Sequence, residues 1–315
     1  MGVTIGVLLD TKGPETRIGK TPEKFIRFAK GNFVTIVKDD VVNNEKVLTC
    51  DYDGLYDDIS IGHQVLLNDG VTTLKVVDKY DDKIICQVEN EGIAFSHSKV
   101  HFPNTNLNIP FLSKKDKRDI EYAHAMNVDY IALSMISTKE DVLEVNDMLI
   151  NLQNNHISII AKIENASAVE HLDEIVEIAD GVMAARGDMG VELTMARVPM
   201  VQKEIIEKCH EHGKISIVAT EMMASMEKNA RPTGAEVADV ANAVMVAADA
   251  VMLSGETTIG SYPIETVEMM NKIIAVAEED INYIELLDNA MRTEKQDITS
   301  AIAYRGVVSA NILKA

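Results

Sequence analysis

The chain has 315 residues, of which 46% are apolar, enough to build a large buried core. Thirty basic residues stand against fifty acidic ones, which gives a formal net charge of −20 at pH 7. A surface of this sign repels phosphate backbones and anionic lipids, so nucleic acids and membranes are not expected partners. No apolar run is long enough to span a bilayer, and the three cysteines form no CxxC pair. We therefore expect a cytoplasmic globular protein.

The first part of the chain combines one buried strand with a segment of different character. Val3–Leu9 is nearly continuous in apolar residues, as is typical of a parallel strand buried on both faces. From about Gly13 to Asn108, short β-type runs separated by Gly, Asn and Asp predict hairpins, and hence a small antiparallel barrel or sandwich. The runs are Phe33–Lys38, Lys46–Cys50, Gln64–Leu67, Val71–Val77 and Lys83–Val88. We expect an all-β module inserted into a βα domain after its first strand.

From Asp129 onward, short apolar runs alternate with longer helical segments, which predicts an α/β fold with parallel strands. The polar residues that repeatedly follow these runs favour a TIM-type (β/α) barrel, with an open doubly wound sheet as the alternative. Together with Val3–Leu9 the strands number six, whereas a closed barrel has eight, so the predicted barrel is incomplete. The later runs are Tyr130–Met135, Ile157–Ile163, Gly181–Ala185, Ile215–Ala219 and Ala250–Leu253.

Helix-start signals fall between these runs. Capping-box spacing begins at Ser113, at Ser137 and at Thr233, each followed three residues later by Asp or Glu. Pro263 fits the first position of a helix, where its missing N–H costs no hydrogen bond. The tail from Asp297 is also predicted to be helical.

The strongest indication of a site lies at the ends of the predicted barrel strands. Lys162 and Glu164 are two residues apart at the end of one strand, so their side chains point to the same side. The next strand is followed by Asp188, and the two after it by Thr220 and Glu256. In a barrel all these ends lie on one face, where such enzymes keep their active sites. Two carboxylates there are hard oxygen ligands suited to Mg²⁺ or Mn²⁺.

Each of these residues also has a purely structural interpretation. Lys162 and Glu164 could form an ion pair in the barrel interior. Asp188 and Glu256 could cap the helices that follow them, and Thr220 could be a loop hydroxyl. Their common position at the ends of successive strands favours the site.

The loop after the first strand, Asp10–Arg17, offers a second set of polar groups. Asp10 and Thr11 provide oxygen ligands, while Lys12 and Arg17 could neutralise phosphates, although an ordinary polar turn explains the loop nearly as well. His101 is expected on the surface of the β module. The sequence contains no HExxH, GxGxxG or GxxxxGK[ST] motif, which argues against a zinc hydrolase, a Rossmann domain and a P-loop enzyme.

Five strings, in order along the chain, resemble the pyruvate kinase family. The resemblance covers roughly residues 3–280 and implies a TIM barrel with a β lid that closes over a nucleotide. It implies phosphoryl transfer from phosphoenolpyruvate to ADP, giving pyruvate and ATP in glycolysis. The strings are Leu8–Glu15, Ile160–Asn165, Ala185–Asp188, Asn229–Glu236 and Met252–Thr257.

The resemblance also implies roles for individual residues. Glu164 and Asp188 match the ligands of the divalent metal, Mg²⁺ or Mn²⁺. Lys162 matches the lysine that stabilises the transferring phosphoryl group, and Thr220 matches a threonine near the enol proton-transfer step. The backbone of Arg186–Asp188 matches the cradle for the substrate carboxylate. The implied substrate-binding residues are Lys162, Ala185, Arg186, Gly187, Asp188 and Thr220.

Potassium and nucleotide sites follow from the same resemblance. Asp10 and Thr11 match part of the K⁺ site, and Glu15 matches the position that accompanies potassium dependence. Arg17 matches a contact to the nucleotide phosphates, and Lys99 lies near the position of the nucleotide-binding lysine of the lid. The expected small-molecule partners are phosphoenolpyruvate and ADP or ATP, and the family implies a homo-oligomer, a tetramer.

The resemblance leads to a division of the chain and to one departure from the family. We divide the chain into a barrel strand at 1–13, a lid at 14–108, a barrel with the catalytic residues at 109–284 and the start of a C-terminal α/β domain at 285–315. Family segments before Val3 and after about Asn289 are absent from this sequence, so we expect a truncated member that is inactive or poorly folded by itself. Two alternatives stay open: a metal-dependent barrel lyase acting on 2-oxo acids, and a non-catalytic fragment that only binds ligand.

Overall fold

The computed structural model describes residues 5–39, 41–103, 105, 107–154, 156–282, 284–287 and 298–313. The chain divides into two compact units, Met1–Ala179 with Ala185–Val201, and Asp180–Ala184 with Gln202–Ala315. The first unit contains the β module and three parallel strands, and the second contains the later strands and the helices around them.

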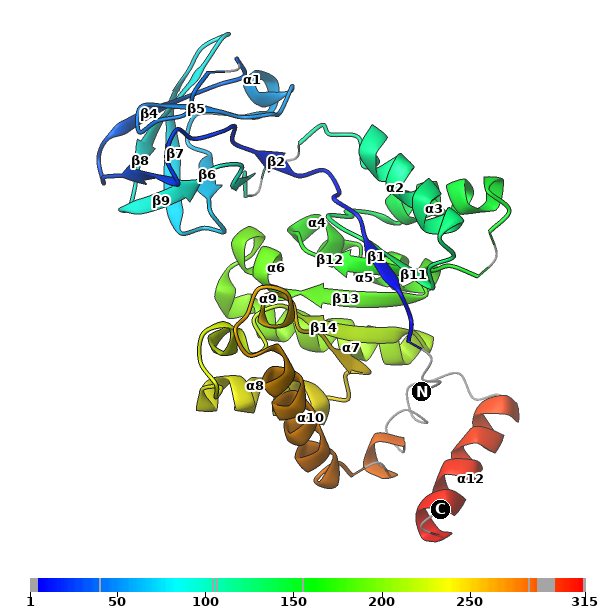
Figure 1. The fold of residues 1–315 in the computed structure, drawn as a ribbon. Coiled ribbons are helices and arrows are strands. Elements are labelled where there is room, and N and C mark those ends of the chain that lie inside the picture. The colour runs from blue at the N-terminus through cyan, green and yellow to red at the C-terminus, as the bar shows by residue number, and fades with distance from the viewer. Residues whose placement is uncertain are drawn as a thin grey trace. The chain divides into compact units, whose positions relative to one another are not determined.

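Three parallel strands form the sheet of the first unit, in the order β1 (Leu8–Asp10), β11 (Tyr130–Leu133) and β12 (Ser158–Ile163). They run side by side in Figure 1, with Leu8 paired to Tyr130 and Tyr130 to Ser158. β11 and β12 are largely buried, as their apolar runs predict. The expectation of a first strand buried on both faces is wrong for β1, because among the described strands it pairs only with β11 and Leu8 is 38% exposed. Val3 and Thr4 of that predicted strand lie outside the described residues.

Helices follow the strands of the first unit. The predicted box at Ser113 is confirmed, since Ser113 and Asp116 cap each other's backbone at the start of a helix. The box predicted at Ser137 is wrong by one residue: Thr138 is the cap, and the Asp141 carboxylate accepts the N–H groups of both Ser137 and Thr138. The helical elements are α2 (Lys114–Ala125), α3 (Lys139–Asn151), α4 (Ala166–Glu170), α5 (Leu172–Ile178), α6 (Arg186–Glu192) and the 3-10 turn η1 (Met195–Arg197).

The β module, which we call the lid, consists of a seven-stranded sheet and a separate pair of strands. The larger sheet has the order β2-β10-β6-β7-β8-β4-β5, and β3 pairs with β9. Its buried apolar core draws on residues from Ile18 to Phe102. The bounds are β2 (Thr16–Arg17), β3 (Phe25–Phe28), β4 (Phe33–Val37), β5 (Val47–Thr49), α1 (Leu55–Asp58), β6 (Gln64–Leu67), β7 (Thr72–Lys79), β8 (Ile84–Val88), β9 (Gly92–Phe95) and β10 (Lys99–His101).

One pair of lid strands differs from the predicted hairpins. β4 and β5 run parallel, with Thr35 opposite Val47, whereas the other pairs in the sheet are antiparallel. Asn43 and Asn44, expected to mark a hairpin turn, instead hold the returning chain. The Asn44 side chain accepts the N–H of Val47, and the Asn43 side chain accepts the N–H of Thr49.

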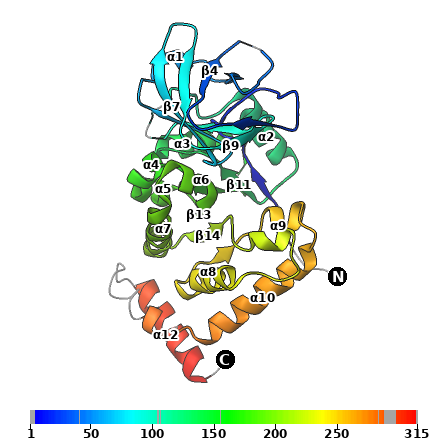
Figure 2. The same ribbon diagram turned by 90° about the vertical axis from the view of Figure 1, so that its left-hand side faces the viewer.

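The second unit contains β13 (Gly181–Ala185), β14 (Ile215–Ala219) and β15 (Ala250–Val251), neighbours in that order. α8 and α10 pack side by side, as Figure 2 shows, and Pro263 occupies the predicted first position of α10. Among the described residues, no helix has the length and apolar character needed to cross a membrane. The helical elements are α7 (Val198–His212), η2 (Ala224–Glu227), α8 (Gly234–Met245), α9 (Gly255–Thr258), α10 (Pro263–Glu279) and α12 (Ile298–Leu313).

The predicted capping box at the start of α8 is confirmed, and its glutamate also binds the backbone of η2. Glu236 accepts the N–H of Thr233 at 2.7 Å and the N–H of Ser225 at 2.7 Å. Burial favours a raised pKa for this carboxyl, but the hydrogen bonds from Ser225 and Thr233 outweigh it and lower the pKa.

Replacing Glu236 with alanine is expected to lower the free energy of unfolding by about 1–2 kcal/mol at pH 7. Because the folded-state pKa lies below the ordinary value of 4.5, this contribution is present above that pH. It is lost as the pH falls through the folded-state pKa. Urea titrations of both proteins at neutral and acid pH measure the difference. Glu265→Ala, an exposed carboxylate in the first turn of α10, is the control and should change stability by less than about 0.5 kcal/mol.

Candidate active site

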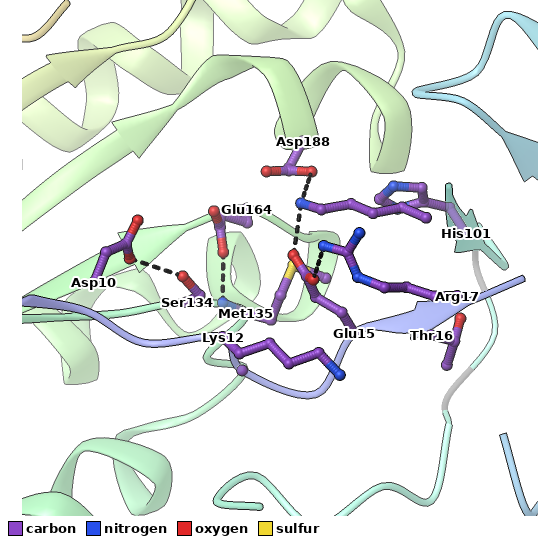
Figure 3. A network of polar contacts seen from close by, with 12 residues as sticks. Asp10, Lys12, Glu15, Thr16, Arg17, His101, Ser134, Met135, Glu164 and Asp188 are labelled. Atoms are coloured by element: carbon purple, nitrogen blue, oxygen red, sulfur yellow. Dashed lines mark hydrogen bonds and ion pairs between the residues drawn. The ribbon is translucent and has the colours of Figure 1, made fainter. Parts of the chain in front are cut away.

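The polar residues that end the strands of the first unit gather around Lys162, near the end of β12. Its Nζ donates to Ser134 Oγ at 2.7 Å, and lies 3.0 Å from Glu164 Oε1 and 3.2 Å from Asp10 Oδ1. Ser134 Oγ in turn donates to Asp10 at 3.0 Å, and the N–H of Met135 donates to Glu164 (Figure 3). One ammonium group is therefore held by two carboxylates and a hydroxyl.

Burial shifts the pKa values of Lys162 and Glu164 in opposite directions. For Lys162, burial favours a lower pKa, but the carboxylates of Glu164 and Asp10 outweigh it and raise the pKa. For Glu164, whose side chain is 2% exposed, burial raises the pKa to about 6, although the Lys162 ammonium lowers it. The Asp188 carboxylate also raises the pKa of Glu164. The Lys162 ammonium is thus firmly protonated at pH 7, and the carboxylate of Asp188 is close enough to that of Glu164 to affect its charge.

A second ion-pair group joins the lid to α6. Lys99 Nζ on β10 lies 2.7 Å from Glu15 and 2.9 Å from Asp188 in the first turn of α6. The other Glu15 oxygen lies 2.6 Å from the Arg17 guanidinium. Burial favours a raised pKa for Asp188, but Lys99 and, more weakly, His101 and Lys162 lower it. Lys99 of the lid segment therefore lies beside the barrel carboxylate expected to bind metal, and Glu15 links it to Arg17.

The loop between β1 and the lid is fixed by a buried carboxylate. Asp116 Oδ1 accepts the N–H groups of Lys12 at 3.0 Å and Gly13 at 3.2 Å. Gly13 has a φ of +69°, and a Cβ built on it would lie 2.4 Å from the Ser134 carbonyl oxygen. Thr11 is buried, and its hydroxyl accepts the N–H of Ser134. This close packing positions Ser134 against Lys162.

The other residues predicted from the sequence fall in two places. Ala185 ends β13, and Arg186 and Gly187 open α6, with Arg186 buried. Thr220 belongs to the second unit, where it follows β14 with a φ of +69°. Backbone conformations of this kind are uncommon outside glycine and are concentrated at functional sites.

Glu256, also in the second unit, has the structural role that the sequence left open. It is buried, and its two carboxylate oxygens accept the N–H groups of Met223 and of Ser254, the residue before α9. Because the Glu256 carboxylate accepts hydrogen bonds from two backbone N–H groups, it stabilises the turn at the start of α9.

A cavity of about 660 Å³ lies within the first unit beside the Lys99 group. Its walls combine charged lid residues with the start of α4. Among the lining residues are Glu15, Lys99, His101, Asn165 and Glu192.

Two residues of this region were missed by the sequence reasoning. Ser134 lies within the predicted strand Tyr130–Met135, whereas β11 ends at Leu133, so the rule that polar residues follow strand ends would have found it with the correct boundary. His101, expected on the surface, is 5% exposed and pairs with Glu192 of α6. That expectation is wrong because the burial comes from a helix about ninety residues further along the chain.

Comparisons with known proteins agree on one family. The family model described as pyruvate kinase, barrel domain, matches residues 1–267. A pyruvate kinase of Bacillus licheniformis is 42% identical over 304 residues, covering 96% of this chain and 52% of the relative. One of Clostridium acetobutylicum is 40% identical over 312 residues, covering 99% of this chain and 66% of the relative.

The fold shows the same likeness. The crystal structure of a pyruvate kinase from Cryptosporidium parvum superposes with a TM-score of 0.90 at 36% identity, covering 99% of this chain and 65% of that one. The chain spans about half the length of the Bacillus relative. The expected fold, a TIM-type barrel that is incomplete at six strands within the described residues and carries a β lid, is confirmed. The chain belongs to the pyruvate kinase family.

Proposed function

We propose that the chain transfers the phosphoryl group of phosphoenolpyruvate to ADP, and that protonation of the resulting enol gives pyruvate. The observation that carries this proposal is the buried Lys162 ammonium held between Asp10, Ser134 and Glu164. Phosphoryl transfer needs positioning and charge neutralisation more than covalent catalysis. A buried, firmly charged lysine beside metal-binding carboxylates supplies both.

We propose that Glu164 and Asp188 hold a divalent cation, Mg²⁺ or Mn²⁺. The donor set fits such an ion, because two carboxylates lie close enough for the charge of Asp188 to raise the pKa of Glu164, and a cation between them relieves this repulsion. When bound, the cation supplies positive charge to the phosphoryl oxygens. Asp10 and Thr11 offer a carboxylate and a buried hydroxyl as part of a K⁺ site.

The remaining roles belong to the chain's own groups. The Lys162 ammonium neutralises charge on the transferring phosphoryl group, and the backbone of Ala185–Asp188 binds the substrate carboxylate. We assign Arg17 and Lys99 to the nucleotide phosphates, because both lie on the lid segment and meet at Glu15. Thr220 is proposed for the proton-transfer step from its match to the family motif. In this assignment residues 14–108 form the lid and 109–284 the catalytic part of the barrel.

The two basic residues also weigh against the lyase alternative. A lyase acting on 2-oxo acids has no nucleotide phosphate for Arg17 and Lys99 to bind. We further propose a cytoplasmic homo-oligomer, a tetramer as in the family, without nucleic-acid or membrane partners.

The test couples pyruvate formation from phosphoenolpyruvate and ADP to NADH oxidation, with and without Mg²⁺ and K⁺. Turnover that requires Mg²⁺ supports the proposal and overturns the expectation, which stays a prediction, that this chain is inactive by itself. The melting temperature is measured in parallel. Without turnover, a Mg²⁺-dependent rise of the melting temperature on adding phosphoenolpyruvate would assign a binding role only, and no rise would contradict the proposal.

A further inference from the structure

Three potential metal ligands meet where the tip of a lid hairpin approaches α6. They are Asp69 in the turn between β6 and β7, His101 on β10, and Asp188 in α6. One ligand atom from each lies within 4.8 Å of the other two. A Cβ built on Gly70, next to Asp69, would be 3.9 Å from the side chain of Val191 in α6, so the hairpin tip and the helix are neighbours. In Figure 3 the side chains of His101 and Asp188 both lie in the upper part of the network.

The burial and hydrogen bonding of His101 leave one of its ring nitrogens available to bind a metal ion. Its side chain is 95% buried, and Nδ1 lies 2.9 Å from a carboxylate oxygen of Glu192. A carboxylate can only accept, so in the neutral imidazole Nδ1 carries the hydrogen and Nε2 keeps its lone pair. Nε2 is buried and has no hydrogen-bond partner among the described residues. A carboxylate behind an imidazole is the arrangement that orients histidine ligands in metal sites.

The mixture of donor atoms selects the kind of ion. One imidazole nitrogen with two carboxylates suits zinc, cobalt and related transition metals, whereas Mg²⁺ prefers oxygen ligands alone. The surroundings carry an excess of negative charge: Asp69, Asp188, Glu192 and Glu15 stand against Lys99 and Arg17. Lys99 occupies Oδ1 of Asp188, and a carboxylate has a second oxygen to offer.

We propose that Asp69, His101 and Asp188 bind a divalent transition-metal ion of the zinc type, at a site distinct from the one assigned to Glu164 and Asp188. Two of its ligands belong to the lid and one to α6, so the bound ion ties the lid to the barrel. Because it shares Asp188, it competes with Lys99 and with the cation of the catalytic site for that carboxylate. The bound ion therefore holds the lid in place and opposes turnover. Binding itself is measured without substrates and does not rest on the proposed function.

The test titrates tag-free protein with Zn²⁺ by calorimetry in the absence of Mg²⁺, because a cation at the catalytic site would compete for Asp188. Thermal melting is followed with the same ion, and Co²⁺ absorption reports nitrogen ligation. We expect one Zn²⁺ per chain and a rise in melting temperature. Asp69→Asn and His101→Gln should each weaken binding by at least about 100-fold, and Glu192→Gln by about 10–100-fold.

Two matched controls separate this site from adventitious binding. His97→Gln removes an exposed histidine of the lid, and Asp82→Asn removes an exposed carboxylate at another lid turn. Both should bind Zn²⁺ as the unchanged protein does. Asp69 is exposed, so its variant should fold even if the His101 variant does not. The proposal is overturned if the unchanged protein binds no Zn²⁺, or if Asp69→Asn binds it with unchanged affinity.

Discussion

Replacing Lys162 with methionine is expected to lower the rate of pyruvate formation by about 10²–10³-fold, the loss typical of removing one preorganised charge-stabilising donor. Methionine keeps most of the length and apolar volume of the side chain but none of its charge. The Lys162 ammonium touches Asp10, Ser134 and Glu164, and none of these three groups carries a positive charge. The coupled assay measures the rate at saturating phosphoenolpyruvate and Mg²⁺.

The same substitution should also destabilise the fold, which provides the control. Removing Lys162 leaves the buried Glu164 carboxylate without its counter-charge, and breaking a buried pair costs about 3–5 kcal/mol. The double variant Lys162→Met with Glu164→Gln should recover much of this stability but no activity. Lys139→Met, which removes a lysine that is 40% exposed and pairs with Glu174, should leave both quantities nearly unchanged. Full activity of the double variant would contradict the role given to Lys162.

The second large effect is expected from Gly13→Ala, which should lower the free energy of unfolding by about 2–4 kcal/mol. Gly13 has a φ of +69°, and its new methyl group would lie 2.4 Å from the Ser134 carbonyl oxygen, a backbone atom. Either the loop or Ser134 must move. Movement of the loop strains the bonds from Lys12 and Gly13 to Asp116, and movement of Ser134 withdraws its hydroxyl from Lys162.

Gly31→Ala is the control that separates the cost of steric overlap at Gly13 from the cost of the left-handed backbone conformation. Gly31 has a φ of +87°, but nothing lies within 4 Å of a Cβ built there. Its substitution should therefore cost only the left-handed strain, about 1–2 kcal/mol. Urea unfolding measures both variants. Equal losses of stability at the two positions would show that the contact with Ser134 has no energetic consequence.

The elements best predicted from the sequence are short strands made mainly of apolar residues that are mostly buried. Gly181–Ala185 and Ile215–Ala219 form strands with the predicted bounds, because a mainly apolar run between two helical segments admits few other structures. Gln64–Leu67 in the lid is equally well placed. The missed lid strands β2, β3, β9 and β10 have two to four residues each, too few for alternation to be recognised.

Residues of the candidate site could be predicted only where reactive or charged side chains lie at the end of a strand. Lys162 and Glu164 were found in this way, since Lys162 lies near the end of a long buried strand and Glu164 directly follows it. Pairings between distant segments leave no local pattern. The contacts of Lys99 with Asp188 and of His101 with Glu192 join residues about ninety positions apart, so the burial of His101 could not be read from its neighbours.

The pairing of β1 with β11 sets an order of events during protein synthesis. The contact between Val7 and Asp129 spans 122 residues, and the entire lid is made in between. At the usual 5–20 residues per second, β1 leaves the ribosome roughly 6–25 s before its partner strand exists. The lid's apolar core needs only residues from Ile18 to Phe102. The inserted module can therefore complete its core before β11 is translated, whereas β1 gains its partner strand only afterwards.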